Sequence, residues 1–282
     1  MMLEVLGSAG ATTTPRPGCT CRICVEARER GLPYSRSGPS YFLHGPDVLI
    51  DTPEEANLQL NRAGIRTVAA CFYSHWHPDH TMGRRVWELL NRDWRALPSE
   101  AARPETPVYL PAQVAADFEA RGVREHLDYL AASGDIRIVE LADGEAVELA
   151  GWRFTPVRLA EDYVYAFLIE GDRKRVLLAP DETNGWDPPP EVHGVDLAVI
   201  PMGVCELDPL TGARRIHQDH PVLAGELTFE ETLVIVERLA AGRTVLSHVE
   251  EVDGLSYDDL AELARRHGDR FEFAYDGMVL DV

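Results

Sequence analysis

Six consecutive residues, His75-Trp76-His77-Pro78-Asp79-His80, hold four side chains that can bind a metal ion. They follow an apolar segment, residues 68–74, and precede a stretch with helical character that opens at residues 81–83. Imidazole nitrogens and a carboxylate suit a borderline-soft divalent ion such as zinc. A loop at the end of a strand can direct two of these side chains at one ion and two at its neighbour. Two ions a few ångströms apart can activate a water and hold the oxygens of a displacement.

The spacing H-x-H-x-D-H-x-x-G, which ends at Gly83, resembles the signature of the metallo-β-lactamase superfamily. The resemblance implies an α/β fold, the αββα metallo-β-lactamase sandwich, in which two mixed β-sheets pack face to face and are flanked by helices. It also implies a dinuclear metal site along one edge of the sandwich.

Composition limits the functions that this chain can have. Its 282 residues contain no internal repeat or obvious linker, so we expect a single domain over residues 1–282. The apolar content of 45% and charged content of 26% are typical of a soluble globular protein. A formal net charge of -20 argues against binding to long nucleic acid, which requires a basic face. The net charge does not exclude a small anionic substrate held by metals and arginines.

Cysteine usage and the absence of targeting signals predict the compartment. The sequence has no run of eighteen apolar residues, so we expect no membrane span. Residues 1–7 are typical of a first strand rather than a signal peptide. The five cysteines are odd in number and three lie close together, which favours reduced thiols and metal binding over disulfides. We therefore expect a cytoplasmic protein that does not bind membranes, and we leave a homodimer open.

Short apolar runs bounded by Gly, Pro or Asp predict a series of strands separated by helices. Two helices have clear N-terminal caps. A capping box at residues 228–231 opens a helix that ends at Gly242, and residues 256–259 open a second that ends near Gly268. The predicted strands are 3–6, 40–43, 47–51, 68–74, 107–110, 136–140, 146–149, 152–159, 163–170, 175–179, 196–201, 244–247 and 271–275.

Two residues at strand ends are candidates for further metal ligands. Asp181 follows the apolar residues 176–180, where its carboxylate could bridge two ions, although an Asp in this position could also simply form a turn. His248 follows the predicted strand 244–247, and the superfamily resemblance implies a C-terminal metal-binding His after such a strand. Together with the loop, these residues would give the ligands His75, His77, Asp79, His80, Asp181 and His248.

The resemblance also implies a third His for the first ion, after the strand 152–159, and the sequence has none there. Glu161, or failing that Asp162, is the nearest residue that could coordinate. The second ion has enough protein ligands without a further residue: Asp79, His80, Asp181 and His248. We therefore predict that the second position binds its ion more tightly, and that the first is sparsely occupied or prefers a harder ion such as manganese.

Three thiols lie within six residues at Cys19, Cys21 and Cys24, a spacing that can hold a structural zinc ion if a fourth ligand arrives from elsewhere. This cluster, together with residues 75–80 and 274–278, resembles the phosphoribosyl cyclic-phosphate phosphodiesterase-like branch of the superfamily, a cousin of pyrroloquinoline-quinone biosynthesis protein B. In that branch the fourth ligand is a His three residues past the C-terminal metal His. Here this position is Glu251, so the fourth ligand is Glu251, Asp253 or a water.

The segment 206–226 holds the densest basic patch of an acidic chain. Arg214 and Arg215 could hold a phosphate as substrate-binding residues. His217 or His220 could protonate a leaving oxygen, with His220 slightly preferred, and the resemblance implies a functional His in this region. A solvated loop without a role is the alternative.

These patterns together predict a zinc-dependent hydrolase with one or two ions at the active site. The reaction we expect is attack of a metal-bound hydroxide on a small cyclic or nucleotide-like phosphodiester, with Asp79 as a further catalytic residue. The alternatives are a carboxylic ester, thioester or lactone hydrolase, and a non-catalytic metal-binding carrier with a degenerate site. A tRNA-trimming nuclease is disfavoured by the acidic balance.

Overall fold

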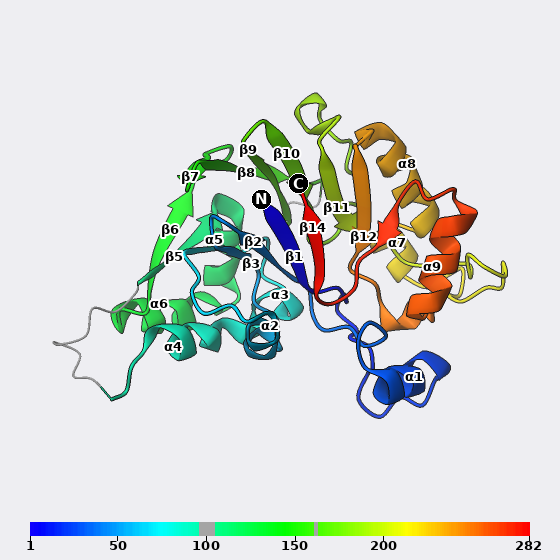
Figure 1. Ribbon diagram of the computed structural model, residues 1–282, viewed down its shortest axis with the longest axis horizontal. Helices are drawn as coiled ribbons and strands as arrows, with labels where there is room; N and C mark the ends of the chain where they lie inside the picture. Colours follow the sequence, from blue (N-terminus) through cyan, green and yellow to red (C-terminus); the bar gives the residue numbers. More distant parts are fainter. Residues whose placement is uncertain (96–104, 161–162) are drawn as a thin grey trace.

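The computed structural model describes residues 1–95, 105–160 and 163–282. Over these residues the chain forms two seven-stranded β-sheets that face one another, with helices on their outer sides (Figure 1). Each sheet contains both antiparallel and parallel strand pairs. The predicted αββα sandwich of two mixed sheets is therefore confirmed.

The first sheet combines the N-terminal half of the chain with the last strand, in the order β14-β1-β2-β3-β4-β5-β6. Strand β1 lies antiparallel between β14 and β2, whereas β3 to β6 run parallel to one another. The strands are β1 (Met2–Gly7), β2 (Ser40–His44), β3 (Val48–Ile50), β4 (Ala70–Phe72), β5 (Thr106–Pro111), β6 (Ile136–Leu141) and β14 (Met278–Asp281).

The second sheet is formed by consecutive strands, in the order β13-β12-β11-β10-β9-β8-β7. Strands β10 to β13 are parallel neighbours, and β7 to β10 form antiparallel hairpins. The strands are β7 (Val147–Leu149), β8 (Trp152–Arg158), β9 (Tyr165–Gly171), β10 (Lys174–Leu178), β11 (Leu197–Pro201), β12 (Arg243–Ser247) and β13 (Glu272–Phe273).

Helices cover the outer face of each sheet, and α1 projects from the body of the molecule (Figure 1). Both predicted helix caps are present, and each is a capping box, at Thr228 before α8 and at Ser256 before α9. Among the described residues, no helix has both the length and the apolar character needed to cross a membrane. The helices are α1 (Arg22–Arg30), α2 (Ala56–Ala63), α3 (Pro78–Thr81), α4 (Val86–Asn91), α5 (Ala112–Ala120), α6 (Arg124–Ala132), α7 (Val222–Gly225), α8 (Phe229–Leu239) and α9 (Tyr257–Arg266).

Three hydrophobic clusters correspond to the layers. One lies between the two sheets and includes Phe72 of the first sheet and Phe154 and Phe167 of the second, whose rings contact one another. A second cluster joins the first sheet to α2, α4, α5 and α6, and a third joins the second sheet to α8 and α9. Burial of this apolar surface on both sides of each sheet is the main term that holds the layers together.

The strand directions place polar residues from distant segments at one edge of the sandwich. Parallel neighbouring strands end at the same edge of a sheet. Strands β3 and β4 are parallel neighbours, and β11 is the parallel neighbour of both β10 and β12. The residues that follow β3, β4, β10 and β12 therefore meet at one edge of the sandwich. All but one of these segments were predicted to carry metal ligands; the end of β3 was not.

Candidate metal centre

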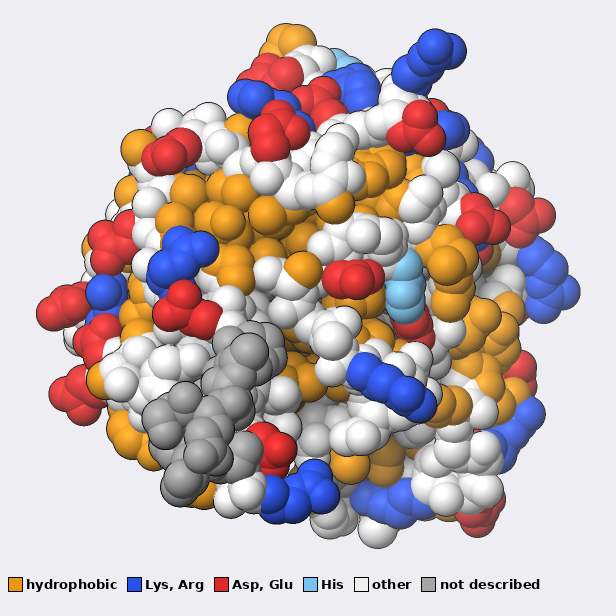
Figure 2. Space-filling view, turned by 60° about the vertical axis from the view of Figure 1, so that its left-hand side comes forward, with side chains coloured by type: hydrophobic (Ala, Val, Ile, Leu, Met, Phe, Trp, Pro, Cys, Tyr) orange, Lys and Arg blue, Asp and Glu red, His pale blue; other side chains and the backbone are white. Residues whose placement is uncertain are grey.

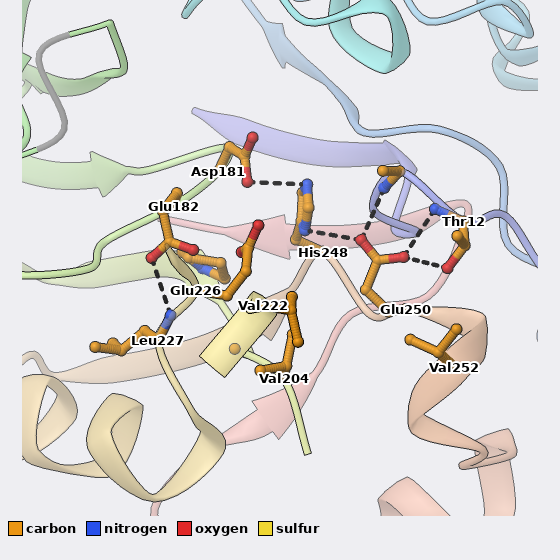
Figure 3. A pocket seen from close by; sticks show the side chains of 13 residues that line it. Thr12, Asp181, Glu182, Val204, Val222, Glu226, Leu227, His248, Glu250 and Val252 are labelled. Atoms are coloured by element: carbon orange, nitrogen blue, oxygen red, sulfur yellow. Dashed lines mark hydrogen bonds and ion pairs between the residues drawn. The ribbon is translucent and has the colours of Figure 1, made fainter. Parts of the chain in front are cut away.

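Six predicted ligands come together in the structure from three separate segments. The loop after β4 continues into the short helix α3 and carries four of them. Pro78 begins the helix, and the His80 ring centroid lies 4.2 Å from that of His75. Asp181 follows β10, and His248 follows β12 (Figure 3). The ligand set is His75, His77, Asp79, His80, Asp181 and His248.

The two oxygens of Asp181 face different groups of imidazoles. Oδ2 lies 3.0 Å from His75 Nε2, 3.6 Å from His80 Nε2 and 3.8 Å from His77 Nδ1, so His80 borders both sides. Oδ1 lies 3.1 Å from His248 Nε2. This arrangement fits a carboxylate that bridges two cations, one on the His75 side, which we name the first position, and one on the His248 side, the second position.

The buried nitrogens at this centre fit a metal ion. Within the described residues, the Nε2 atoms of His75, His80 and His248 are buried and make no hydrogen bond of good geometry, although Asp181 oxygens lie 3.0 Å from His75 Nε2 and 3.1 Å from His248 Nε2. Burial, helped by the nearby charge of His80, lowers the pKa of His75 to about 4, so this imidazole is neutral at pH 7 with a lone pair to donate. His75, His80 and Asp181 can offer ligand atoms within 4.8 Å of one another, and so can Asp79, His80 and His248.

A carboxylate that the sequence did not reveal orients two of the imidazoles. Asp51, fully buried at the end of β3, lies with Oδ2 2.7 Å from His80 Nδ1 and 2.6 Å from the Ser74 hydroxyl that donates to it. That hydroxyl oxygen is 3.0 Å from His75 Nδ1. With the Nδ1 atoms engaged, the Nε2 atoms of both rings are directed at the metal positions. Asp51 therefore fixes the orientation of these metal-binding imidazoles through their Nδ1 sides.

The backbone at two of these residues adopts a left-handed conformation. Asp51 has φ 61° and His248 has φ 54°, in a region that few residues other than glycine occupy. Such backbone strain is concentrated at functional sites, where the surrounding contacts maintain it. Gly10 is required beside His248, because a Cβ there would lie 2.5 Å from the imidazole Cε1.

The first position is bordered by aromatic rings. The ring centroid of Tyr163 lies 5.1 Å from that of His77 and 5.9 Å from that of His75. Trp76 contacts the same ring, and the Arg121 guanidinium lies 4.1 Å from the Trp76 ring centre. Tyr163 was not among the predicted site residues. The ligands expected for this position, Glu161 or Asp162, lie outside the described residues, so their role stays a prediction.

Asp79 is a partly buried ligand, less exposed than His77. Its Oδ2 lies 3.4 Å from His80 Nε2 and 3.9 Å from His248 Nε2. Burial alone would raise the pKa of this carboxyl, but the imidazoles of His80 and His248 outweigh that effect and lower it. The carboxylate is therefore ionised at neutral pH and can bind a cation.

The three clustered cysteines meet Glu251, in the turn η3 (Glu251–Asp253). Its Oε1 lies 3.1 Å from the sulfurs of Cys19 and Cys21 and 3.2 Å from that of Cys24. Four ligand atoms thus surround one point, as a tetrahedral zinc site requires. Asp253, the other candidate, accepts hydrogen bonds from backbone N–H groups of Cys205 and Glu250 instead.

Burial raises the pKa of Cys24 to about 12, so this thiol is protonated without a metal. A bound zinc ion would deprotonate it and replace the hydrogen bonds to Glu251. The donor set fits zinc, and the structural metal itself stays a prediction.

The basic residues of the segment 206–226 have partners within that segment. Arg214 pairs with Glu206 at 2.6 Å, and Arg215 pairs with Asp208 at 2.7 Å, so both guanidinium groups already have carboxylate partners. His217 and His220 are exposed and accept hydrogen bonds through Nδ1 from backbone N–H groups two residues further on. Their roles in substrate binding and proton transfer stay predictions.

Residues 45–249 match the family described as the β-lactamase superfamily domain. This segment includes all six metal-centre ligands and more than half of the chain. The chain belongs to this family. A divalent metal is implied by the family and by the ligand geometry.

Solved structures with this metallo-β-lactamase fold align with the whole chain. A diphosphatase of the PhnP family is 24% identical, with a TM-score of 0.70, over 100% of this chain and 97% of that one. Zinc-bound PqqB from Methylobacterium extorquens is 17% identical, with a TM-score of 0.73, over 100% of both chains. At these identities the likeness shows the fold, and the predicted resemblance to both branches is confirmed at that level.

A curated relative is ribonuclease Z from Archaeoglobus fulgidus, which is 29% identical over 147 residues. The match covers 49% of this chain and 44% of that protein, so the chain spans less than half of the length of the ribonuclease.

Proposed function

We propose that this protein is a metal-dependent phosphodiesterase that acts on small diesters. The observation that carries the proposal is the position of Asp181, whose Oδ2 lies 3.0 Å from His75 Nε2 and whose Oδ1 lies 3.1 Å from His248 Nε2. A bridged pair of positions suits displacement at phosphorus, in which charge develops on several oxygens at once. The diphosphatase and ribonuclease similarities point to the same bond type, since both named activities cleave phosphorus–oxygen bonds.

We propose zinc as the ion at the second position, because imidazole and carboxylate ligands suit it. When bound, the ions would activate a water molecule and offset the negative charge of the phosphate oxygens. Asp181 would fix the spacing of the two positions, and Asp51 would hold His80 and His75 in one orientation. The carboxylate of Asp79 would accept a proton from the attacking water.

The surface supports a small anionic substrate rather than long nucleic acid. Figure 2 shows a face on which acidic and basic side chains are scattered around broad hydrophobic areas, and the atoms not drawn in grey form no basic stripe there. With a net charge of -20, attraction of a polyanion along such a face would be weak. A small diester would instead be held by the ions themselves.

Hydrolysis of bis(p-nitrophenyl) phosphate tests the proposal. Protein freed of metal and then loaded with zinc, manganese or iron(II) should release p-nitrophenol, and His77→Ala should lose most of this activity. His193→Ala is the matched control, because this ring lies 2.9 Å from the Pro188 carbonyl oxygen, and it should behave as wild type. Hydrolysis of p-nitrophenyl acetate or a thioester without any diester turnover would identify a carbonyl hydrolase instead. Metal binding without turnover of diester, ester or thioester would identify a binding protein.

A further inference from the structure

One short turn carries ligands of two separate metal-ligand clusters. His248, at the second metal position, follows β12, and Glu251 lies three residues later, at the start of η3. Glu251 faces the sulfurs of Cys19, Cys21 and Cys24, and we name these four residues the thiol site. Only two residues of backbone therefore separate the thiol site from a ligand of the metal centre.

The loop that carries the cysteines is hydrogen-bonded along this turn. The Val249 N–H donates to the Ser8 carbonyl oxygen at 3.0 Å. The Glu251 N–H donates to the carbonyl oxygen and to the hydroxyl of Thr12, each at 3.1 Å. These bonds begin next to His248 and end at the thiol site, so the loop holds the backbone of the whole turn.

The same loop also contacts the His248 ring. The Glu250 carboxylate accepts hydrogen bonds from the N–H groups of Ala11 at 2.8 Å and Thr12 at 2.7 Å. Its Oε1 lies 3.8 Å from His248 Nδ1 (Figure 3). On the loop side, a Cβ at Gly10 would lie 2.5 Å from the imidazole Cε1, so the loop backbone lies directly against the ring.

The conformation of His248 depends on these contacts. Its φ of 54° lies in the left-handed region, which a residue other than glycine occupies only while its surroundings maintain it. The surroundings here are residues 8–12, which bond to residues 249–251. If the loop loses its anchor at the cysteines, these contacts weaken and the direction of His248 Nε2 is no longer fixed.

The thiol site provides that anchor when it holds an ion. Without one, a single oxygen of Glu251 accepts hydrogen bonds from three thiols, which are weak donors. An ion at the centre of the four groups replaces these bonds with stronger bonds to sulfur and oxygen. It thereby ties the N-terminal loop and the start of α1 to η3 at one point.

We propose that the thiol site controls the second metal position, because an ion bound there fixes the turn that presents His248. Binding of the first of these ions raises the affinity of the protein for the other, and by linkage the factor is the same in both directions. The inference goes beyond the proposed function and does not depend on the reaction catalysed. Removal of the ion from the thiols therefore also weakens the metal centre.

Zinc affinity at the second position tests the coupling. Cys21 is exposed, so Cys21→Ser should keep the fold while removing a ligand of the thiol site. We expect the second position of this variant to bind zinc about tenfold more weakly than in wild type, within the range usual for coupled sites. Competition with a chromogenic chelator measures the affinity. Thr20→Ala, at the exposed residue between two of the cysteines, is the matched control and should bind as wild type.

Cobalt(II) shows whether the thiol site is filled, because thiolate ligands give it a strong charge-transfer absorption that imidazole and carboxylate ligands do not. Wild-type protein should show this absorption and Cys21→Ser should lose it. If the absorption is lost but zinc affinity at the second position is unchanged, the inference is wrong. It is equally wrong if wild-type protein never shows the absorption, since the thiol site then holds no ion.

Thr12→Val tests the route, because it removes a hydroxyl that accepts from the Glu251 N–H without changing a ligand of either site. In a double-mutant cycle, Cys21→Ser should lower zinc affinity much less in the Thr12→Val background than in wild type. Thr13→Val, at the neighbouring residue, should leave the full effect. An undiminished effect in Thr12→Val would exclude the turn as the route and overturn the inference.

Reciprocity distinguishes coupling from general loss of structure. His248→Ala should lower the cobalt affinity of the thiol site by about the factor found in the opposite direction. His77→Ala, which removes a ligand of the first position, should leave that affinity unchanged. Equal losses in both variants, or none in either, would overturn the inference. No turnover is measured in these experiments, so a protein that hydrolyses no diester would refute the proposed function alone.

Discussion

Asp51 orients two of the metal-binding imidazoles, His80 directly and His75 through Ser74. Replacing Asp51 with Asn keeps the shape but converts half of the acceptor into a donor, so the His80 ring loses its fixed orientation. We expect zinc affinity to fall about 10- to 100-fold, measured by competition with a chromogenic chelator. Asp47→Asn, at the other end of β3, should leave the affinity unchanged; a similar loss there would argue against a specific role for Asp51.

The two metal positions should differ in affinity. The second has Asp79, His80, Asp181 and His248 around it, whereas the first has two imidazoles and a shared carboxylate among the described residues. During titration of metal-free protein with zinc, we expect one ion to bind more tightly than the other. His248→Ala should remove the tight phase, and His77→Ala should remove the weak one, as followed by calorimetry. The opposite result would show that the positions are assigned the wrong way round.

Glu182 should make the stability of the metal-free protein depend on pH. Burial, together with hydrogen bonding to Glu226, raises the pKa of Glu182 to about 10 from an ordinary 4.5. The folded state therefore holds a proton that the unfolded chain releases above pH 4.5, so stability falls as the pH rises toward 10.

Glu182→Gln removes this titration. At pH 8 in EDTA, we expect the variant to be more stable than wild type by about 1 kcal/mol or more, since each pKa unit corresponds to about 1.4 kcal/mol. Urea unfolding at several pH values measures the effect, with exposed Glu230→Gln as the control. A variant less stable than wild type at pH 8 would contradict the assignment of a protonated carboxyl.

Helix α8 begins at a reciprocal capping box, in which the Thr228 hydroxyl and the Glu231 carboxylate each engage the other's backbone N–H. Thr228→Ala leaves an N–H group at the helix start without a partner. We expect a loss of about 1 kcal/mol of unfolding free energy, measured by urea denaturation. Thr67→Ala, an exposed threonine outside any helix or strand, should have little effect.

Elements with strong local patterns could be predicted from the sequence, and those defined by partners could not. Thr228 and Ser256 marked α8 and α9 because capping is a local interaction. Strand β14 was missed as a separate element, since its pairing with β1 joins residues at opposite ends of the chain. The metal loop was recognisable because four ligands lie within six residues.

The same distinction holds within the site. Asp51 and Glu182 are single acidic residues whose neighbours in sequence reveal no role. Their functions depend on contacts with His80 and Glu226 across long stretches of chain. Tyr163 likewise became a candidate only through its ring contacts with His75 and His77.

At the scale of the whole molecule, the cysteine cluster connects the N-terminal loop to the turn after His248. If zinc is bound by Cys19, Cys21, Cys24 and Glu251, then Cys24→Ser should remove one equivalent of zinc and lower the melting temperature. Elemental analysis and calorimetry would measure both effects. Glu251→Ala should act in the same direction, whereas Glu29→Ala, an exposed residue of α1, should not. Unchanged zinc content in both Cys24→Ser and Glu251→Ala would exclude the site.

The position of β1 between β14 and β2 has a consequence for how the protein matures. Strand β1 obtains one of its two neighbours only when residues 278–281 have been synthesised. His248 and Glu251 also emerge late, long after residues 75–80 and the cysteines. A nascent chain therefore carries these thiols and imidazoles before their partners exist, so we expect complete metal coordination only after residue 251 has been synthesised.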